Sequence, residues 1–236
     1  MSYFLSPQNL FPNLELEIDG EEAAHILFSR RVKVGAIVEF QGPDGHRFKT
    51  SIIDAKKRSV IVKVLEETDV PEELKIPITL FQAFISEKAL DFIFQKGTEL
   101  GLNSIVLFNA QNTPSKLTNE IFQAKSARWE KILWEAAKQS GRGTIPKVSF
   151  VEKFDNVITK INELGSFFML DQSAQESLVI KKALSCGYIV GPEGGFSGEE
   201  LKSFKTHLHI QQLKISPFTL RAETAALAGL VLLNAS

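Results

Sequence analysis

Short runs of alternating hydrophobic and polar residues occupy positions 32–65. The alternating runs are "VKVGAIVEF", "FKTSII" and "SVIVKVL", and the stretches between them are "QGPDGHR" and "DAKKR". A period of two residues, interrupted by turn-forming glycine, proline and aspartate, is typical of antiparallel strands joined by tight connections. This part of the chain therefore predicts a small barrel or sandwich.

From residue 76 onward, apolar runs of strand length alternate with longer runs of helical periodicity, which predicts an α/β domain. Strands are predicted at 76–84, 104–108, 166–170, 188–191 and 213–215, and helices at 86–100, 119–140 and 222–234. Acidic residues and two prolines mark a linker near 67–75. The expected domains are therefore 1–70 and 74–236.

A glycine-rich loop, "IVGPEGGFSGEE" at 189–200, follows one predicted strand. Ser197 and Glu200 form a capping-box pattern, so a helix is predicted to start directly after the loop. Ligands of open α/β sheets bind at the carboxyl ends of strands, and glycine lets a ligand approach bare main chain. The loop is either a ligand site or a tight connection whose glycines serve only the turn. It matches neither a P-loop nor G-x-G-x-x-G.

The segment "SPFTLRAETAALAG" at 216–229 places Arg221, Glu223 and Thr224 at the entry of a helix made of small apolar residues. Free N–H groups at a helix start, together with an arginine and an acid, suit a polar ligand. A capping arrangement in which Arg221 and Glu223 pair explains the pattern equally well. Because the helix is apolar nearly all round, it is expected to be buried in the core or in a subunit interface.

Basic residues recur on one face of the helix predicted at 119–140, and Arg142 follows its end. This face is a candidate for phosphate contacts or an ordinary solvated surface. The strand-rich segment adds basic residues that suit RNA contacts or solubility: Arg30, Arg31, Lys33, Arg47, Lys49, Lys56, Lys57 and Arg58. The net charge of −1 does not favour a nucleic-acid partner, although local clustering can create a basic face.

The composition, with 44% hydrophobic and 23% charged residues in a chain of 236, indicates a globular protein with a substantial core. No apolar run approaches the roughly 18 residues that span a bilayer, and "MSYFLSPQNL" does not resemble a signal peptide, so a cytoplasmic protein without a membrane partner is expected. The single cysteine, Cys186, excludes an internal disulfide or a thiolate cluster. Only His207 and His209 lie close together among the histidines, so no metal site is expected.

Four motifs resemble, in order, those of one family: "QKGTELG" at 95–101, "EAAKQSGRGTIPKV" at 135–148, "IVGPEGGFSGEE" at 189–200 and "LRAETAALAG" at 220–229. They are similar to the ribosomal RNA small subunit methyltransferase E family of the SPOUT superfamily. Its members use S-adenosylmethionine (SAM) to methylate N3 of a uridine in 16S rRNA of the small ribosomal subunit. Residues 25–65 also resemble the family's PUA-like barrel, so the resemblance covers nearly the whole chain.

The resemblance implies an α/β fold with a SPOUT-type methyltransferase domain, knotted as a trefoil, preceded by a small PUA-like β-barrel domain that binds RNA. It also implies a homodimer that completes each site. Three loops would hold SAM, after the strand at 166–170, at 191–195 and at 215–221. The cofactor-binding residues expected are Leu170, Gly191, Pro192, Glu193, Gly194, Gly195, Ile215, Ser216, Phe218, Leu220 and Thr224.

Roles for charged side chains follow from the same resemblance. The expected catalytic residues are Arg221, which would stabilise negative charge on uracil as N3 loses its proton, and Glu223, which would fix the helix entry. Residues expected on the RNA side are Arg30, Arg31, Arg128, Lys131, Lys138, Gln139, Ser140 and Arg142. The chain departs from the family at 110–117, where "AQNTPSKL" replaces a Glu-Arg-Ser-like stretch.

Two other functions stay compatible with the sequence. One is a related SPOUT enzyme that methylates another position, such as a ribose 2′-hydroxyl. The other is a non-catalytic RNA-binding or ribosome-assembly protein. Arg221 and the intact glycine loop argue against a pure binding protein, which needs no methyl-donor pocket, and the barrel segment favours uridine N3 over another target.

Overall fold

The computed structural model describes residues 3–29, 32–164, 166–171, 174, 186–207 and 210–235. The chain folds into two compact units. The first consists of residues 1–73 and 137–144, and the second of residues 74–136 and 145–236. Residues 137–144, which the sequence pattern assigned to the second domain, thus lie in the first unit.

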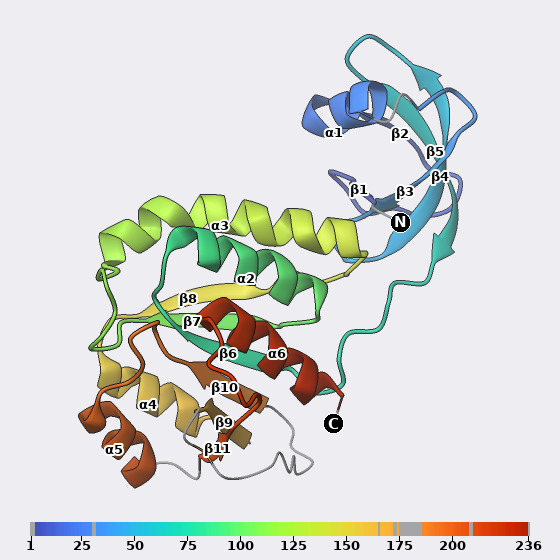
Figure 1. The fold of residues 1–236 in the computed structure, drawn as a ribbon. Coiled ribbons are helices and arrows are strands. Elements are labelled where there is room, and N and C mark those ends of the chain that lie inside the picture. The colour runs from blue at the N-terminus through green and yellow to red at the C-terminus, as the bar shows by residue number, and fades with distance from the viewer. Residues whose placement is uncertain are drawn as a thin grey trace. The chain divides into compact units, whose positions relative to one another are not determined.

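The first unit is built around a curled five-stranded sheet in the order β1-β3-β4-β5-β2 (Figure 1). Its strands are β1 (Phe4–Leu5), β2 (Glu15–Ile18), β3 (Ile37–Gln41), β4 (Arg47–Ala55) and β5 (Val60–Thr68). β1 pairs parallel with β3, and the other pairs are antiparallel, as the alternation predicted. A short helix, α1 (Gly20–Ala24), continues into a π-helical turn, η1 (His25–Ser29), and Ala23 and Ile26 pack into the core of the sheet.

The second unit contains a six-stranded, fully parallel sheet in the order β11-β9-β10-β6-β7-β8 (Figure 1). Its strands are β6 (Ile78–Ala83), β7 (Ser104–Phe108), β8 (Lys147–Val151), β9 (Ser166–Leu170), β10 (Cys186–Val190) and β11 (Gln211–Leu213). β10 lies between β6 and β9, although β9 precedes it in the chain. The chain therefore crosses from one side of β6 to the other between β8 and β9 and returns inward to form β10.

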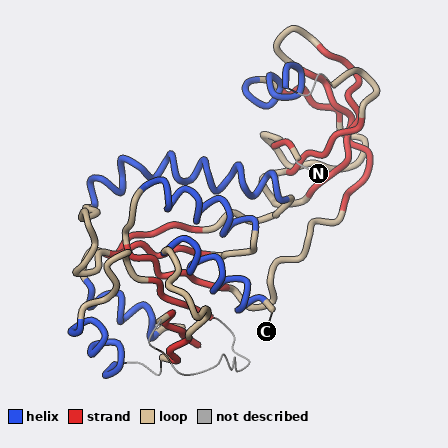
Figure 2. The backbone as a smooth tube through the Cα atoms, in the orientation of Figure 1, coloured by secondary structure: helices blue, strands red, loops and turns tan. Residues whose placement is uncertain are grey.

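Helices cover both faces of this sheet (Figure 2). One face packs against α2 (Glu87–Glu99), α3 (Asn119–Ser140) and α6 (Ala222–Asn234), and the other against α4 (Phe154–Asn162) and α5 (Gly198–His207). The first core includes Phe94, Trp129 and Leu230, and the second includes Ile158 and Phe204. Because both faces of the central strands are buried, their sequences are apolar almost throughout.

The predicted α/β architecture is confirmed, and most elements lie where the periodicity placed them. The predicted capping box is present, because Ser197 N–H donates to Glu200 Oε2 (2.8 Å) and Glu200 N–H donates to Ser197 Oγ (3.3 Å). β8 and α4 lie where no element was predicted. The strand predicted at 213–215 is displaced by two residues, since Ile215 lies in a cavity wall and outside the sheet.

Helix α6 lies against β9 and β10 with no side chain at Gly229 to separate them. A Cβ atom at Gly229 would lie 2.8 Å from Leu170 Cδ1 and 3.1 Å from Tyr188 Cε2. The buried Tyr188 hydroxyl donates a hydrogen bond to the carbonyl of Ala226 (2.7 Å). Burial raises the pKa of this hydroxyl, so it stays protonated and able to donate. Packing therefore requires glycine at position 229.

Replacing Gly229 by alanine is expected to lower the free energy of unfolding by about 1–3 kcal/mol, because the added methyl overpacks the contact with Leu170 and Tyr188. Urea denaturation measures the change. Gly198→Ala is the matched control, since a Cβ there meets nothing within 4 Å, and its stability should stay within about 0.5 kcal/mol of the parent. Unchanged stability of the Gly229→Ala protein would contradict the close approach.

Candidate active site

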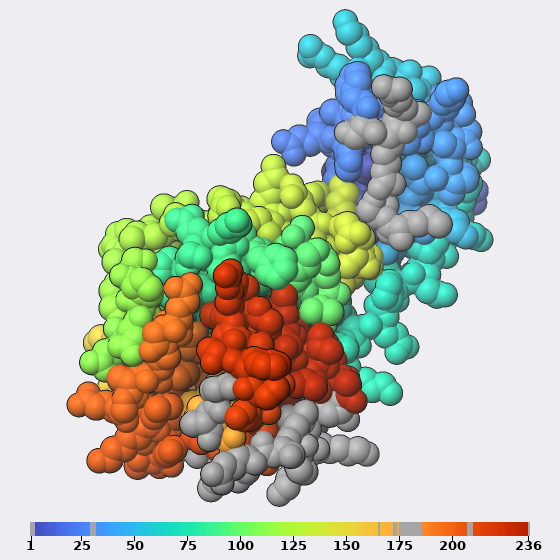
Figure 3. All heavy atoms as spheres, in the orientation of Figure 1, coloured from blue at the N-terminus to red at the C-terminus, as the bar shows by residue number. Residues whose placement is uncertain are grey.

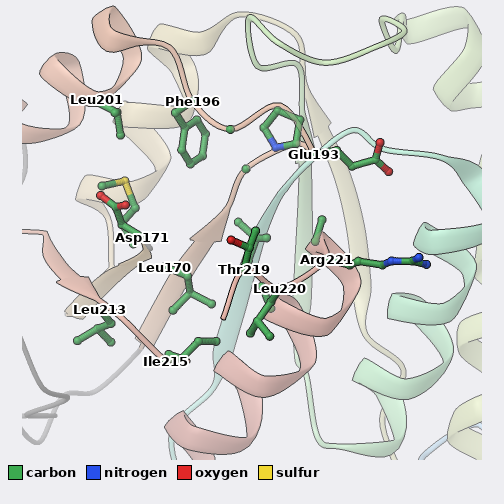
Figure 4. Close-up of a pocket in the computed structure, with 17 residues that line it drawn as sticks. Leu170, Asp171, Glu193, Phe196, Leu201, Leu213, Ile215, Thr219, Leu220 and Arg221 are labelled. Atoms are coloured by element: carbon green, nitrogen blue, oxygen red, sulfur yellow. The ribbon is translucent and has the colours of Figure 1, made fainter. Parts of the chain in front are cut away.

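A cavity of about 530 Å³ lies at the carboxyl ends of β9 and β10 in the second unit (Figure 4). Its wall comes from the end of β9, the glycine turn after β10, the segment after β11 and the first turn of α6. This volume suits a small-molecule ligand, and open α/β sheets bind ligands at this edge. The glycine loop singled out by the sequence is thus part of a cavity wall.

The predicted site residues that line the cavity are Leu170, Gly191, Pro192, Glu193, Gly195, Ile215, Leu220 and Arg221. Three segments far apart in the sequence meet there, as the resemblance implied. Gly194, Ser216, Phe218, Glu223 and Thr224 do not belong to the lining. Phe218 is 76% exposed, and Thr224 is exposed on α6.

The glycine turn after β10 is held by its own main chain. Gly195 N–H donates to the carbonyl of Pro192 (2.9 Å), and its φ of +69° lies in the left-handed region that favours glycine. A Cβ at Gly191 would lie 3.1 Å from the ring of Phe196. The sequence left open whether the loop forms a ligand site or only a tight connection. Both descriptions apply to the structure, because these glycines allow the turn and the turn forms a cavity wall.

The side of Gly194 that would carry a side chain is turned toward another loop. A Cβ at this position would lie 3.1 Å from the Cβ of Asn112, which belongs to the loop between β7 and α3. Asn112 Nδ2 donates to the carbonyls of Gly194 (3.2 Å) and Gly195 (3.1 Å). In this structure the missing side chain of Gly194 leaves room for Asn112.

Charged groups at the cavity come from separate segments. Asp171 directly follows β9, Glu193 lies in the glycine turn, and Arg221 precedes α6. The side chains of Glu193 and Arg221 point away from the apolar group formed by Leu170, Leu213, Ile215 and Leu220 (Figure 4). Within the described residues, Arg221 forms no ion pair with Glu223 and no side-chain cap of α6. Its guanidinium thus remains available to a ligand.

The model of a family described as an RNA methyltransferase domain matches residues 72–234. A ribosomal RNA small subunit methyltransferase E of Aquifex aeolicus is 30% identical over 184 residues, covering 73% of this chain and 74% of the relative. The chain belongs to the ribosomal RNA small subunit methyltransferase E family. The protein of that name in Bacillus subtilis is 28% identical over 236 residues, covering 96% of this chain and 92% of its own.

Solved structures of similar proteins match the fold over nearly the whole chain. A methyltransferase from Legionella pneumophila, in complex with the bound cofactor SAM, has a TM-score of 0.85 at 27% identity and covers 99% of this chain and 96% of that one. The ribosomal RNA small subunit methyltransferase E of Neisseria gonorrhoeae has the same fold, with a TM-score of 0.85 at 24% identity. The predicted fold class, a SPOUT-type domain preceded by a small PUA-like domain, is confirmed.

Part of the cavity wall in this family member was not predicted: Met169, Asp171, Val190, Phe196, Leu201, Leu213, Ala222 and Ala225. Thr219 also lines the cavity and belongs to the loop expected at 215–221. The sequence could have identified Asp171 as a site residue, because it directly follows a predicted strand and ligands bind at the carboxyl ends of such strands. No sequence pattern identifies Leu201 as a site residue, since it lies on α5 and only the packing of that helix brings it to the cavity.

Cys186 takes no part in the site. It is buried at the start of β10, and burial raises the pKa of its thiol to about 11, so the reactive thiolate is scarce at neutral pH. Cys186 is thus part of the hydrophobic core. Across the described residues no group of three or more potential ligands could hold a metal ion, and no described helix is long and apolar enough to cross a membrane. His209 and the side chain of His207 lie outside the described residues.

The residues predicted to face RNA lie in different surroundings. Arg30 and Arg31 lie outside the described residues. On the surface of the second unit, Arg128 pairs with Asp91, and Lys131 is exposed. In the first unit, Gln139 is exposed, and the Ser140 hydroxyl donates to the carbonyl of Ala137 (3.2 Å).

Lys138 and Arg142 are buried in ion pairs within the first unit. Lys138 Nζ lies 2.7 Å from Glu22 Oε1, and Arg142 donates to both carboxylate oxygens of Glu73 (3.1 and 2.5 Å). Although burial opposes it, hydrogen bonds from Arg142 and Thr144 lower the pKa of the Glu73 carboxyl, so this acid stays charged. These two cations, predicted to face RNA, are engaged within the protein.

Arg47 is also buried, although the sequence grouped it with solvent-facing turn residues. Its guanidinium carbon lies 3.9 Å from the ring centre of Tyr3, and Nη2 donates to Gln41 Oε1 (2.9 Å) and to the carbonyl of Gly141 (3.1 Å). The carbonyls at the end of a helix attract cations because they lack partners within the helix. Arg47 therefore helps to hold residues 137–144 in the first unit.

Proposed function

We propose that this protein is a SAM-dependent methyltransferase that methylates N3 of one uridine in 16S rRNA of the small ribosomal subunit. The observation that carries the proposal is the cavity at the ends of β9 and β10, lined by the glycine turn, in a member of this family. A 27% identical relative binds SAM in the same fold. The substrate places the enzyme in the cytoplasm, where small subunits are assembled.

The residues of the cavity fit SAM. Leu170, Leu213 and Ile215 offer an apolar wall for the adenine ring, and the main chain of the glycine turn offers hydrogen-bonding groups. Asp171 and Glu193 place negative charge beside a ligand that carries a sulfonium and an ammonium group. SAM supplies a methyl group on positively charged sulfur when bound. The predicted contacts of Gly194, Ser216, Phe218 and Thr224 with it are part of this proposal.

Arg221 is assigned to the target base. Uracil N3 must lose its proton as the new bond to carbon forms, and the developing negative charge is stabilised by a cation held in place beforehand. Arg221 is exposed and lines the cavity. It is the N-cap residue directly before α6, and the helix fixes the position of its main chain. Glu223 and Thr224, in the first turn of α6, would hold this helix entry.

RNA contacts are assigned to exposed basic residues. In the first unit these are Lys33, Lys57 and Arg58, and in the second they include Lys131. Lys138 and Arg142 are less suited, because both cations are buried and moving either to a phosphate would break its ion pair with a partly buried carboxylate. The domain assignment that accompanies this proposal is an RNA-binding domain at 1–70 and a methyltransferase domain at 74–236.

An exposed apolar surface on α6 fits a second copy of the chain. Val231 and Leu232 are 47% and 37% exposed, and Leu100 at the end of α2 is 37% exposed. Asn234 Nδ2 donates to the carbonyl of Leu100 (2.7 Å), which joins the ends of the two helices. Figure 3 shows α6, in red, on the surface turned toward the viewer, next to α2. Adjacent exposed apolar side chains mark association surfaces, and this supports the proposed homodimer.

The first test supplies the purified protein with labelled SAM and small ribosomal subunits from a strain that lacks this gene, and identifies the methylated nucleoside after digestion. N3-methyluridine at one position is expected. Methylation of another atom would replace the proposed target by that of a related SPOUT enzyme. Binding of SAM without transfer to subunits or to naked rRNA would instead favour a non-catalytic protein.

Arg221→Ala is expected to lower kcat by about 100- to 1000-fold while the Kd for SAM changes less than about threefold, because the lost charge acts on the reacting base. Single-turnover methylation and calorimetry measure the two quantities. Lys160→Ala is the control, since this lysine is an exposed cation on α4 outside the cavity lining and outside the residues assigned to RNA. Comparable losses of rate and SAM affinity in Arg221→Ala would make Arg221 a cofactor-binding residue.

Leu232→Glu is expected to convert a dimer into a monomer at micromolar concentration, because two carboxylates would be buried in the symmetric interface. Light scattering reports the mass. Leu65→Glu is the matched control, since Leu65 is a similarly exposed leucine (41%) on β5 of the first unit. A parent protein that is monomeric and fully active would refute the homodimer.

A further inference from the structure

Asn112 connects two loops of the second unit. It lies between β7 and α3, and its side-chain amide donates hydrogen bonds to two consecutive carbonyls of the glycine turn, those of Gly194 (3.2 Å) and Gly195 (3.1 Å). The absence of a side chain at Gly194 lets the Cβ of Asn112 approach this closely. One amide thus holds the outer side of a turn whose inner side lines the cavity.

The loop that carries Asn112 is itself held on both sides of that residue. Asn109 accepts a hydrogen bond from Leu117 N–H (2.9 Å) and donates one to the Leu117 carbonyl (2.8 Å), which closes the loop at its base. Thr113 Oγ1 accepts from Ala110 N–H (3.0 Å). Because these hydrogen bonds lie within the loop itself, they fix the position of Asn112 independently of its contacts with the glycine turn.

Glu200 makes a second connection between the same two loops. Its carboxylate accepts hydrogen bonds from Gln111 N–H (2.8 Å) in one loop and from Ser197 N–H (2.8 Å) in the other. Glu200 is 8% exposed, so these bonds are largely shielded from water. Residues 194–197 are therefore attached at one end by Asn112 and at the other by Glu200.

The orientation of the turn follows from these attachments. In a trans peptide the N–H points opposite to the carbonyl, and the described residues contain no cis peptide bond. Holding the Gly195 carbonyl toward Asn112 directs the next N–H, that of Phe196, away from Asn112. Asn112 thus fixes the peptide orientation in a turn whose residues Gly195 and Phe196 line the cavity.

We propose that Asn112 is a positioning residue for SAM, which it serves through the glycine turn without contacting the ligand. The proposal rests on the proposed function, since it takes SAM as the ligand of the cavity. Without the amide, residues 194–196 sample other peptide orientations, and binding must then select the competent one. The cost appears as a weaker affinity for SAM, while a correctly bound complex reacts at the normal rate.

Asn112→Ala and Asn112→Asp test this assignment, with calorimetric titration of SAM as the principal measurement. The alanine variant is expected to raise the Kd for SAM about tenfold, because two hydrogen bonds that hold the turn are lost. The aspartate variant is expected to bind more weakly still, since an ionised carboxylate of the same shape accepts only and faces two carbonyls. In both variants KM for SAM should rise while kcat at saturating SAM stays within about twofold.

Asn119→Asp is the matched control, because Asn119 is another exposed asparagine of the second unit, and its amide donates to Glu152 away from the glycine turn. The same chemical change there should leave SAM affinity unaltered. The unfolding midpoint without SAM should also be unchanged in all three variants, within about 2 °C.

Tight SAM binding by the parent and equally tight binding by Asn112→Ala would overturn the assignment of Asn112 while leaving the proposed function intact. A fall in the unfolding midpoint without SAM that accompanies the loss of affinity would also overturn it, in favour of a purely structural role. Failure of the parent protein itself to bind SAM would overturn the proposed function, and the inference with it.

Discussion

The second unit depends on the close approach of α6 to the sheet at Gly229. With no side chain there, the helix backbone lies against Leu170 on β9 and Tyr188 on β10, and the Tyr188 hydroxyl bonds the carbonyl of Ala226. That contact fixes the depth at which α6 begins, so its first turn closes the cavity with Ala222 and Ala225. A bulkier contact would move the start of α6 away from the strand ends that complete the cavity.

The site contains few reactive side chains. The turn after β10 contributes glycines and a proline, and its conformation depends on hydrogen bonds from Asn112 and Glu200. A methyl transfer between two bound molecules needs alignment and one stabilising charge, and neither requires a nucleophile or a metal from the protein.

Charge in the first unit is used largely for internal cohesion. Arg47, Lys138 and Arg142 are buried and contact a ring, carbonyls and carboxylates. A chain of net charge −1 can therefore include motifs rich in arginine and lysine without presenting all of them to a phosphate backbone. The buried cations attach residues 137–144 to the unit, whereas the exposed cations are the ones that could contact RNA.

The sequence alone determined the α/β class, most of the strands and helices of the second unit, the helix bounds at 119–140 and the glycine loop, because periodicity, capping and turn chemistry act over a few residues. It could not determine which distant residues share the cavity, that Gly194 faces Asn112, or that Lys138 and Arg142 are buried. Only the tertiary structure decided these points. They depend on strand order and on packing between distant segments, such as Glu22 and Lys138, which are 116 residues apart, and no local pattern records such contacts.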